Sequence, residues 1–208
     1  MDSLLSADDK KDAVIYHANN LASCYLQNDG NGKFTLKRLP VQAQLSMLCG
    51  MSVSDFNGDG NLDVVINGND YGTEVGTGRY DALNGLMMQG DGKGNFISLS
   101  IMQSGIYIPG NGKSLVQLRN YKNECLLAAS ENRGPLRIFK LKENVTCMPV
   151  NSNDEYAIIK LKNGKVRREQ FYYGMSYLSQ SARYLNINSS IKSVQIFNTK
   201  GESRTINF

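Results

Sequence analysis

Alternating oxygen-bearing side chains mark the stretch DFNGDGNLD, residues 55–63. Counted from the first aspartate, side-chain oxygens stand at positions 1, 3, 5 and 9, and position 7 can offer its backbone carbonyl. The candidate ligands are Asp55, Asn57, Asp59, Asn61 and Asp63. Oxygen ligands at this spacing can wrap a calcium ion, which takes about six to eight of them. Gly60 at position 6 permits the sharp turn, so the stretch predicts a calcium site.

The same loop departs from the EF-hand pattern. Position 12, a bidentate glutamate in an EF-hand, is Ile66 here, and the run VVI after the loop is typical of a strand. We therefore expect a loop between two β-strands. A polar turn without metal is the alternative, and magnesium fits less well because it resists an all-protein cage. A degenerate copy, SADDKKD, places Asp8 and Asp12 at the matching positions, but its lysines and missing glycines argue against tight binding.

The strands that would hold this loop are indicated by a repeated pattern. Residues 25–34 (YLQNDGNGKF) align without gaps with residues 87–96 (MMQGDGKGNF), and each predicts a strand, a glycine-rich turn and a second strand opened by an inward Phe. An aspartate followed by an apolar run precedes each hairpin, as DAVIY from Asp12 and DVVIN from Asp63. A weaker third copy is ECLLAAS with GPLRIFKL. The pattern predicts about three β-units of roughly 50 to 60 residues that bury their faces by stacking.

Length and composition fit this all-β expectation. The chain has 208 residues, 20 of them glycine and 4 proline, which favours strands joined by tight turns. The formal net charge of +4 is too mild to indicate nucleic acid. No apolar run is long enough for a membrane span. The acidic N-terminal stretch does not have the pattern of a signal peptide.

Two stretches together resemble known families. DFNGDGNLDVVI followed by LMMQGDGKGNF resembles an FG-GAP/VCBS repeat, the blade unit of integrin-α-type β-propellers. That resemblance implies calcium bound by residues 55–63. The tail, with YLSQS and a closing strand-turn-strand around FNTKG, resembles the ASPIC/UnbV domain, although the usual Trp of that turn is absent. The expected architecture is a partial β-propeller over residues 1–150, its first unit truncated, followed by a small β-domain over residues 151–208.

The resemblances imply a function and a setting. We expect a non-enzymatic, calcium-binding adhesion module of an exported or cell-surface protein, extracellular or periplasmic, that recognises a protein or glycan. Because about three blades cannot close a ring, we expect the chain to be part of a longer propeller protein. The alternative is an accessory part of a surface glycan-processing enzyme.

Residues 67–85, NGNDYGTEVGTGRYDALNG, form an insertion that is long enough to carry function. The candidate partner-binding residues within it are Glu74, Arg79, Tyr80 and Asp81. Glu74 and Asp81 would be the acid/base pair of the enzyme alternative. A purely structural alternative has Arg79 and Asp81 pairing and Tyr80 packing.

Other reactive side chains are expected to be structural. His17 is the single histidine and has no nucleophile motif beside it. The basic run KNGKVRRE, residues 162–169, predicts a solvated hairpin turn. Four cysteines lack zinc-site spacing, so buried thiols or disulfides remain open; they are Cys24, Cys49, Cys125 and Cys147.

Overall fold

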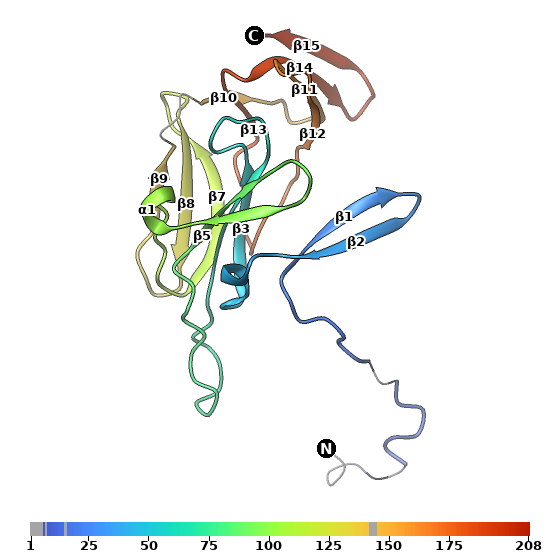
Figure 1. Cartoon of the computed structure of the whole chain (residues 1–208), viewed down its shortest axis with the longest axis vertical. Coiled ribbons are helices and arrows are strands. Elements are labelled where there is room, and N and C mark those ends of the chain that lie inside the picture. The colour runs from blue at the N-terminus through green and yellow to red at the C-terminus, as the bar shows by residue number, and fades with distance from the viewer. Residues whose placement is uncertain (1–5, 7, 15, 142–144) are drawn as a thin grey trace.

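Antiparallel strands are the main regular secondary structure of the chain. The computed structural model describes residues 6, 8–14, 16–141 and 145–208. Their two helices are short: the 3-10 helix η1 (Val41–Gln44) and α1 (Ile101–Ser104) (Figure 1). The expected all-β class is confirmed. None of the helices in these ranges is long and apolar enough to cross a membrane.

The two sequence-matched stretches both form hairpins. β1 (Cys24–Gly30) pairs with β2 (Lys33–Arg38), and β5 (Leu86–Gly90) pairs with β6 (Phe96–Leu99). The inward Phe is wrong for the first hairpin, because Phe34 is 56% exposed. In the second hairpin Phe96 is half-buried beside Tyr25. Within the described residues, the first hairpin has no further strand paired to it, whereas β4 pairs with β5 of the second.

The central sheet has the order β3-β4-β5-β6, with β3 spanning Leu48–Ser54 and β4 spanning Asp63–Gly68. Alternation along β4 sends Val65 to one face and Ile66 to the other. The Ile66 face packs with Met88 and Ala43 of η1. Both faces of the sheet are therefore buried at its two central strands, β4 and β5.

The third sheet, β7-β8-β9, packs against the Val65 face. β7 spans Gly112–Arg119, β8 spans Cys125–Glu131 and β9 spans Arg137–Lys140, so the strands expected from ECLLAAS and GPLRIFKL are confirmed. Leu115 and Leu127 join Val65 in one apolar core.

Two fully buried asparagines hold the junction of these sheets, Asn67 between β4 and β7 and Asn69 between the loops beside them. The amide of Asn67 accepts the N–H of Gly50 at 2.8 Å and donates to the carbonyl of Ser114 at 3.1 Å. Asn69 donates to the carbonyls of Leu83 and Gly110 and accepts the N–H of Leu83. Their polar atoms are thus paired inside the apolar junction, which removes the desolvation cost of burying them.

The C-terminal sheet has the order β12-β11-β14-β15. Its strands are β11 (Asp154–Leu161), β12 (Val166–Gln170), β14 (Ile191–Asn198) and β15 (Ser203–Asn207). The closing strand-turn-strand is confirmed as β14 and β15. A separate pair, β10 (Thr146–Pro149) with β13 (Tyr184–Ile187), crosses the expected domain boundary after residue 150.

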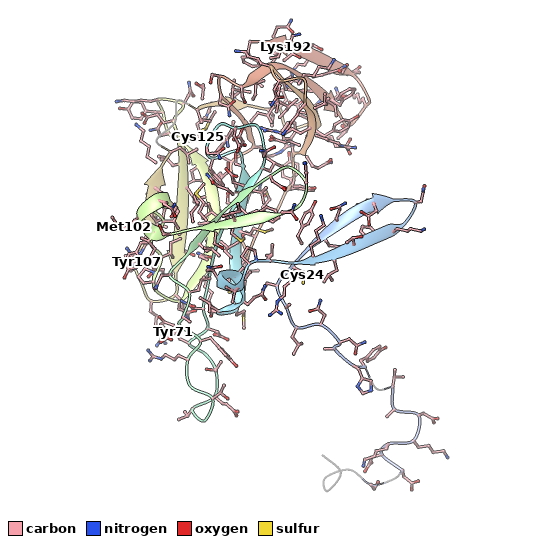
Figure 2. The ribbon with its side chains drawn as sticks, viewed as in Figure 1. Cys24, Tyr71, Met102, Tyr107, Cys125 and Lys192 are labelled. Atoms are coloured by element: carbon pink, nitrogen blue, oxygen red, sulfur yellow. A yellow bond between two sulfur atoms is a disulfide. The ribbon has the colours of Figure 1, made fainter. Side chains whose placement is uncertain are left out.

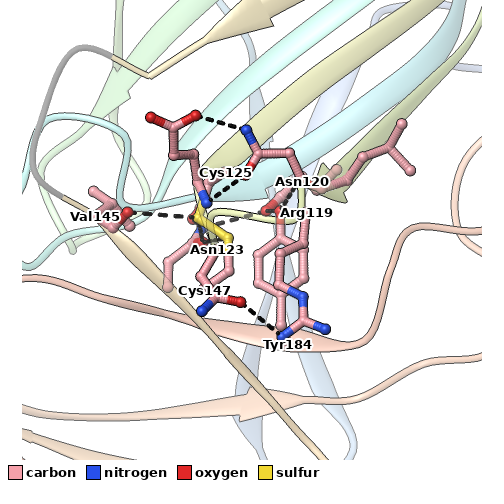
Figure 3. The surroundings of a disulfide bond; sticks show 12 residues. Arg119, Asn120, Asn123, Cys125, Val145, Cys147 and Tyr184 are labelled. Carbon is pink, nitrogen blue, oxygen red and sulfur yellow. Dashed lines mark hydrogen bonds between the residues drawn. A yellow bond between two sulfur atoms is a disulfide. The ribbon is translucent and has the colours of Figure 1, made fainter.

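A disulfide joins Cys125 of β8 to Cys147 of β10 (Figure 3). Val145 is buried beside them, and the Asn186 amide oxygen lies 3.1 Å from the Cys125 sulfur. Cys24 and Cys49 are free and half-buried. The sequence left both states open, and the structure contains one disulfide and two free thiols.

The strand expected from Asp12 is wrong for the part of it that the structure describes. Residues 8–12 form turns and residues 13–14 have no regular secondary structure; Asp12 has φ +66°, and Val14 and Tyr16 are strongly exposed. Residue 15 lies outside the described residues. Figure 1 shows this segment leading away from the body of the fold.

Candidate metal centre

The loop of residues 55–63 connects β3 to β4, as expected for a loop between strands. Ser54 and Asp63 pair across its base. Gly60 has φ +89°, a conformation that side chains other than glycine rarely adopt, so the predicted role of this glycine is confirmed.

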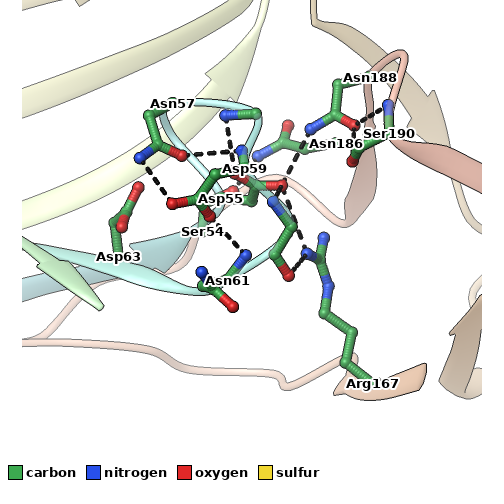
Figure 4. Close-up of polar contacts among 12 residues, drawn as sticks. Ser54, Asp55, Asn57, Asp59, Asn61, Asp63, Arg167, Asn186, Asn188 and Ser190 are labelled. Atoms are coloured by element: carbon green, nitrogen blue, oxygen red, sulfur yellow. Dashed lines mark hydrogen bonds and ion pairs between the residues drawn. The ribbon is translucent and has the colours of Figure 1, made fainter. Parts of the chain in front are cut away.

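Carboxylate and amide oxygens fold this loop around itself. The Asp55 carboxylate accepts the N–H groups of Gly58 at 2.8 Å and Gly60 at 3.0 Å. The Asn57 amide oxygen accepts the N–H of Asp59, and one Asp59 oxygen accepts the N–H of Asn61 at 2.7 Å. These bonds set the alternate side chains around one turn of backbone (Figure 4). A polar turn of this kind uses the same contacts, so they do not by themselves establish a metal site.

Asp63 closes the loop from its buried end. Its carboxylate is fully buried and accepts the N–H groups of Phe56 and Gly90, each at 3.1 Å. Burial raises the pKa of Asp63 to about 6, and the negative charges of Asp59 and Asp55 add to the increase. The three aspartates therefore lie close enough to repel one another, a repulsion that a bound cation would offset.

The C-terminal sheet covers the loop, a contact that the sequence did not reveal. Arg167 of β12 donates to the Gly60 carbonyl at 2.8 Å and lies 3.4 Å from the Asp55 carboxylate (Figure 4). Asn188 donates to the same carboxylate at 3.0 Å. A Cβ on Gly60 would approach Leu161 of β11 to 2.6 Å. The loop is thus the joint between the central and C-terminal sheets.

The basic run is only partly the solvated turn that we expected. Lys165 is exposed and donates to the Asn61 amide oxygen at 3.1 Å. The Arg167 side chain is 12% exposed, so the expectation of solvation is wrong for it. It also bonds Glu169, whose pKa burial raises. In the sequence, Arg167 and Glu169 carry opposite charges two positions apart and would lie on one face of a strand. This spacing indicates a buried polar contact.

The fit of this loop to calcium depends on the mixture of its oxygen donors and not on a cluster of carboxylates. In the described ranges no three His, Cys, Asp or Glu side chains gather at metal-binding spacing. The loop instead offers three carboxylates in different parts of one turn, two amide side chains and the Asn61 carbonyl. Calcium accepts neutral carbonyl oxygens together with carboxylates, in flexible geometry. Such a mixed oxygen set could hold calcium.

The insertion, residues 67–85, protrudes from the end of the molecule that lies away from the C-terminal sheet (Figure 1). Asp70 and Tyr80 exchange two backbone hydrogen bonds at 2.9 Å and close a loop that projects away from the sheets (Figure 1). Arg79 lies over the ring of Tyr71, which Figure 2 labels near the base of this loop, at 5.0 Å from its centre.

The candidate partner-binding residues are all exposed: Glu74, Arg79, Tyr80 and Asp81. Glu74 bonds locally to the hydroxyl of Thr77 at 3.0 Å. Within the described part of the chain no ion pair joins Arg79 to Asp81, so Arg79 is held by the Tyr71 ring instead. His17 is also exposed.

Comparison with known proteins gave no match, either among protein-family models or among curated proteins.

Proposed function

We propose that this chain is a calcium-stabilised, non-enzymatic binding module of an exported or cell-surface protein, with its sheets serving as β-propeller blades. The observation that carries the proposal is the position of the loop of residues 55–63. It combines a calcium-type ligand spacing with burial between two sheets.

A cation at this position would act on stability. Asp55 and Asp63 are buried, and their negative charges repel each other and the negative charge of Asp59. Calcium would neutralise this cluster and fix the turn on which the C-terminal sheet rests. Its role would be to brace the joint between the central and C-terminal sheets.

The stacking of the sheets supports the blade assignment. The central sheet and the β7-β8-β9 sheet share one apolar core, as neighbouring blades do. The protruding insertion supplies exposed aromatic and charged side chains, including Arg79 and Tyr80, which suit recognition of a protein or glycan.

The calcium part is tested by thermal melting and titration calorimetry of the wild type, Asp59→Asn and the control Asp91→Asn. Asp91 lies in the β5–β6 turn, where its carboxylate accepts the N–H groups of Lys93 and Asn95 in a plain polar turn. At one hundred times its dissociation constant, calcium adds about 2.7 kcal/mol to the unfolding free energy. That predicts a rise in melting temperature of about 5–10 °C.

Asp59→Asn should lose most of this rise, and Asp91→Asn should keep it. A wild-type melting curve that is the same in calcium and in EDTA, with no calorimetric signal, would refute the calcium site.

The partner part is tested on glycan and matrix-protein arrays with and without calcium. Because Asp70 and Tyr80 already pair, residues 71–79 can be replaced by Gly-Gly without moving the ends of the loop. The shortened protein should fold normally and lose binding. Retained binding would remove the insertion as the recognition surface.

A further inference from the structure

An apolar groove lies between the first hairpin and the central sheet. Its volume is about 630 Å³, which falls in the range of about 300–1,000 Å³ that is typical of small-molecule sites. Its lining residues come from β1, β3, the β5–β6 turn and the hairpin of β11 and β12. Segments that are far apart in the sequence therefore surround one space.

The walls of the groove are apolar side chains. Tyr25 and Phe96 contact each other edge to face, with ring centres 5.7 Å apart. Met51 of β3 and Val166 of β12 also line the groove, and they are 52% and 58% exposed. A ligand with an apolar body would cover these side chains, and the removal of apolar surface from water favours binding.

The mouth of the groove is built by two turns that meet at one asparagine. In the β5–β6 turn, a Cβ on Gly94 would lie 2.6 Å from the Tyr25 ring, and a Cβ on Gly92 would lie 2.6 Å from the Asn61 amide oxygen. The Lys165 ammonium, in the β11–β12 turn, donates to that same oxygen at 3.1 Å. The two glycines thus allow the β5–β6 turn to approach both the wall and the ammonium group.

This mouth carries positive charge. Lys93 and Lys165 both line the groove and are exposed, and neither forms a salt bridge with a described carboxylate. Among the described lining residues the one carboxylate is that of Asp91, which accepts the N–H groups of Lys93 and Asn95 inside its own turn. The ammonium groups are therefore free to pair with an anion from solution.

Apolar walls and a cationic mouth together select an amphipathic anion. A neutral hydrocarbon would leave the ammonium groups without a partner, and a small hydrophilic anion would leave the walls in water. A fatty-acid anion has an acyl chain for the walls and a single carboxylate for the mouth. Lysine suits such a carboxylate because its ammonium is a compact charge on a flexible stem.

We propose that this groove binds a free fatty-acid anion, with the acyl chain against Tyr25, Met51 and Val166 and the carboxylate between Lys93 and Lys165. The ligand is a small molecule, separate from the protein or glycan partner proposed for residues 67–85. The inference rests on the groove and does not require calcium in the loop of residues 55–63.

Methyl NMR of the full chain, labelled with ¹³C at its methionine methyl groups, tests where the ligand binds. Decanoate is titrated below its micelle concentration, and the Met51 signal is assigned with Met51→Leu. The Met51 signal should shift along a saturable binding curve. Met102 of α1 is 94% exposed and lies outside the groove, so its signal should not move.

An unmoved Met51 signal, or equal shifts of Met51 and Met102, would overturn the proposal. A Met51 signal that shifts with protein concentration in the absence of decanoate would also overturn it, because that result would place a second copy of the chain in the groove.

The role of the charged mouth is tested by calorimetry with decanoate and its neutral analogue 1-decanol. The variant is Lys93→Gln with Lys165→Gln. The matched control is Lys192→Gln with Lys200→Gln, which removes two exposed lysines outside the groove. The variant should bind decanoate at least about tenfold more weakly than the wild type and bind 1-decanol equally well, because only decanoate carries a charge.

The control should bind both ligands like the wild type. Equal weakening for decanoate and 1-decanol would show that the two lysines hold the groove together and do not bind the carboxylate, and it would overturn the proposed ion pairs. Unchanged decanoate affinity in the variant would overturn them too.

Chain length tests the apolar walls. Each methylene buried in the groove should tighten binding by up to about fourfold, so decanoate should bind more tightly than octanoate by up to about fifteenfold. Equal affinities for the two acids would overturn the contact between the acyl chain and the walls.

Discussion

Replacing Arg167 by alanine tests whether the loop of residues 55–63 is the joint of the molecule. The guanidinium is 12% exposed, the Asp55 carboxylate is almost fully buried, and the same guanidinium bonds the Gly60 carbonyl. Removing one partner of a buried pair costs about 3–5 kcal/mol. The 3.4 Å separation is long, and Asp55 keeps three N–H donors, so we expect a loss of about 2–3 kcal/mol of unfolding free energy.

The same variant should respond to calcium in a defined direction. Arg167 and a cation in the loop would repel each other, and even with the screening of water a unit charge a few ångströms from a divalent ion opposes binding by roughly 1–2 kcal/mol. Because Arg167 and Asp55 are largely buried, Arg167→Ala should bind calcium at least about fivefold more tightly than the wild type. Its loss of stability should be largest in EDTA and smaller in saturating calcium, where the ion takes over neutralisation of Asp55.

Urea denaturation in EDTA and in calcium, with calorimetric titration, measures both effects. Lys162→Ala is the matched control, since it removes a positive charge from the exposed turn of the same hairpin. The joint would be wrongly assigned if Arg167→Ala were no less stable than Lys162→Ala. Equal destabilisation in the two buffers, with unchanged calcium affinity, would show that Arg167 does not act on the ion.

Two further predictions concern the packing of the C-terminal sheet. Gly60→Ala should be less stable than Gly201→Ala in urea denaturation by about 1–3 kcal/mol. Both glycines have positive φ, but a Cβ at Gly60 would meet Leu161 whereas one at Gly201 would meet nothing within 4 Å. Equal losses of stability in the two variants would exclude the close contact. The two hydrogen bonds from Arg204 lower the pKa of the buried Asp154 carboxyl, so the stability from this pair is present above the ordinary aspartate pKa of about 3.9 and is lost as pH falls through the lower folded-state pKa. Arg204→Gln should therefore show a smaller fall in urea midpoint between about pH 4 and pH 2, and a fall as large as that of the wild type would contradict this assignment.

Local patterns predicted local structure well in this chain. The Gly-rich turns, the alternation of the strands and the ligand-spaced loop all depend on neighbours in sequence, and the hairpins at residues 25–34 and 87–96 followed from them. The turn at Gly60 was predicted for the same reason.

Contacts between distant segments were not readable in the same way. Arg167 meets Asp55 across 112 positions, and although the spacing of Arg167 and Glu169 indicates a buried polar contact, it does not show which distant carboxylate takes part in that contact. Phe34 was expected inward because residues 25–34 match the motif of residues 87–96, but burial depends on covering neighbours that the motif does not itself supply. The Cys125–Cys147 bond likewise depends on β8 and β10 lying side by side.

The buried amides of Asn67 and Asn69 bear on how a chain of similar units assembles correctly. Hairpins of nearly the same sequence can exchange partners while they fold, and apolar faces alone discriminate poorly among them. Asn67 satisfies its amide only when Gly50 and Ser114 stand at the right places, and Asn69 only with Leu83 and Gly110. A slipped or exchanged pairing would bury these amides without a hydrogen-bond partner or water, at a cost of about 1–3 kcal/mol for each. The two asparagines therefore favour pairing with the native neighbour over pairing with hairpins of similar sequence during folding.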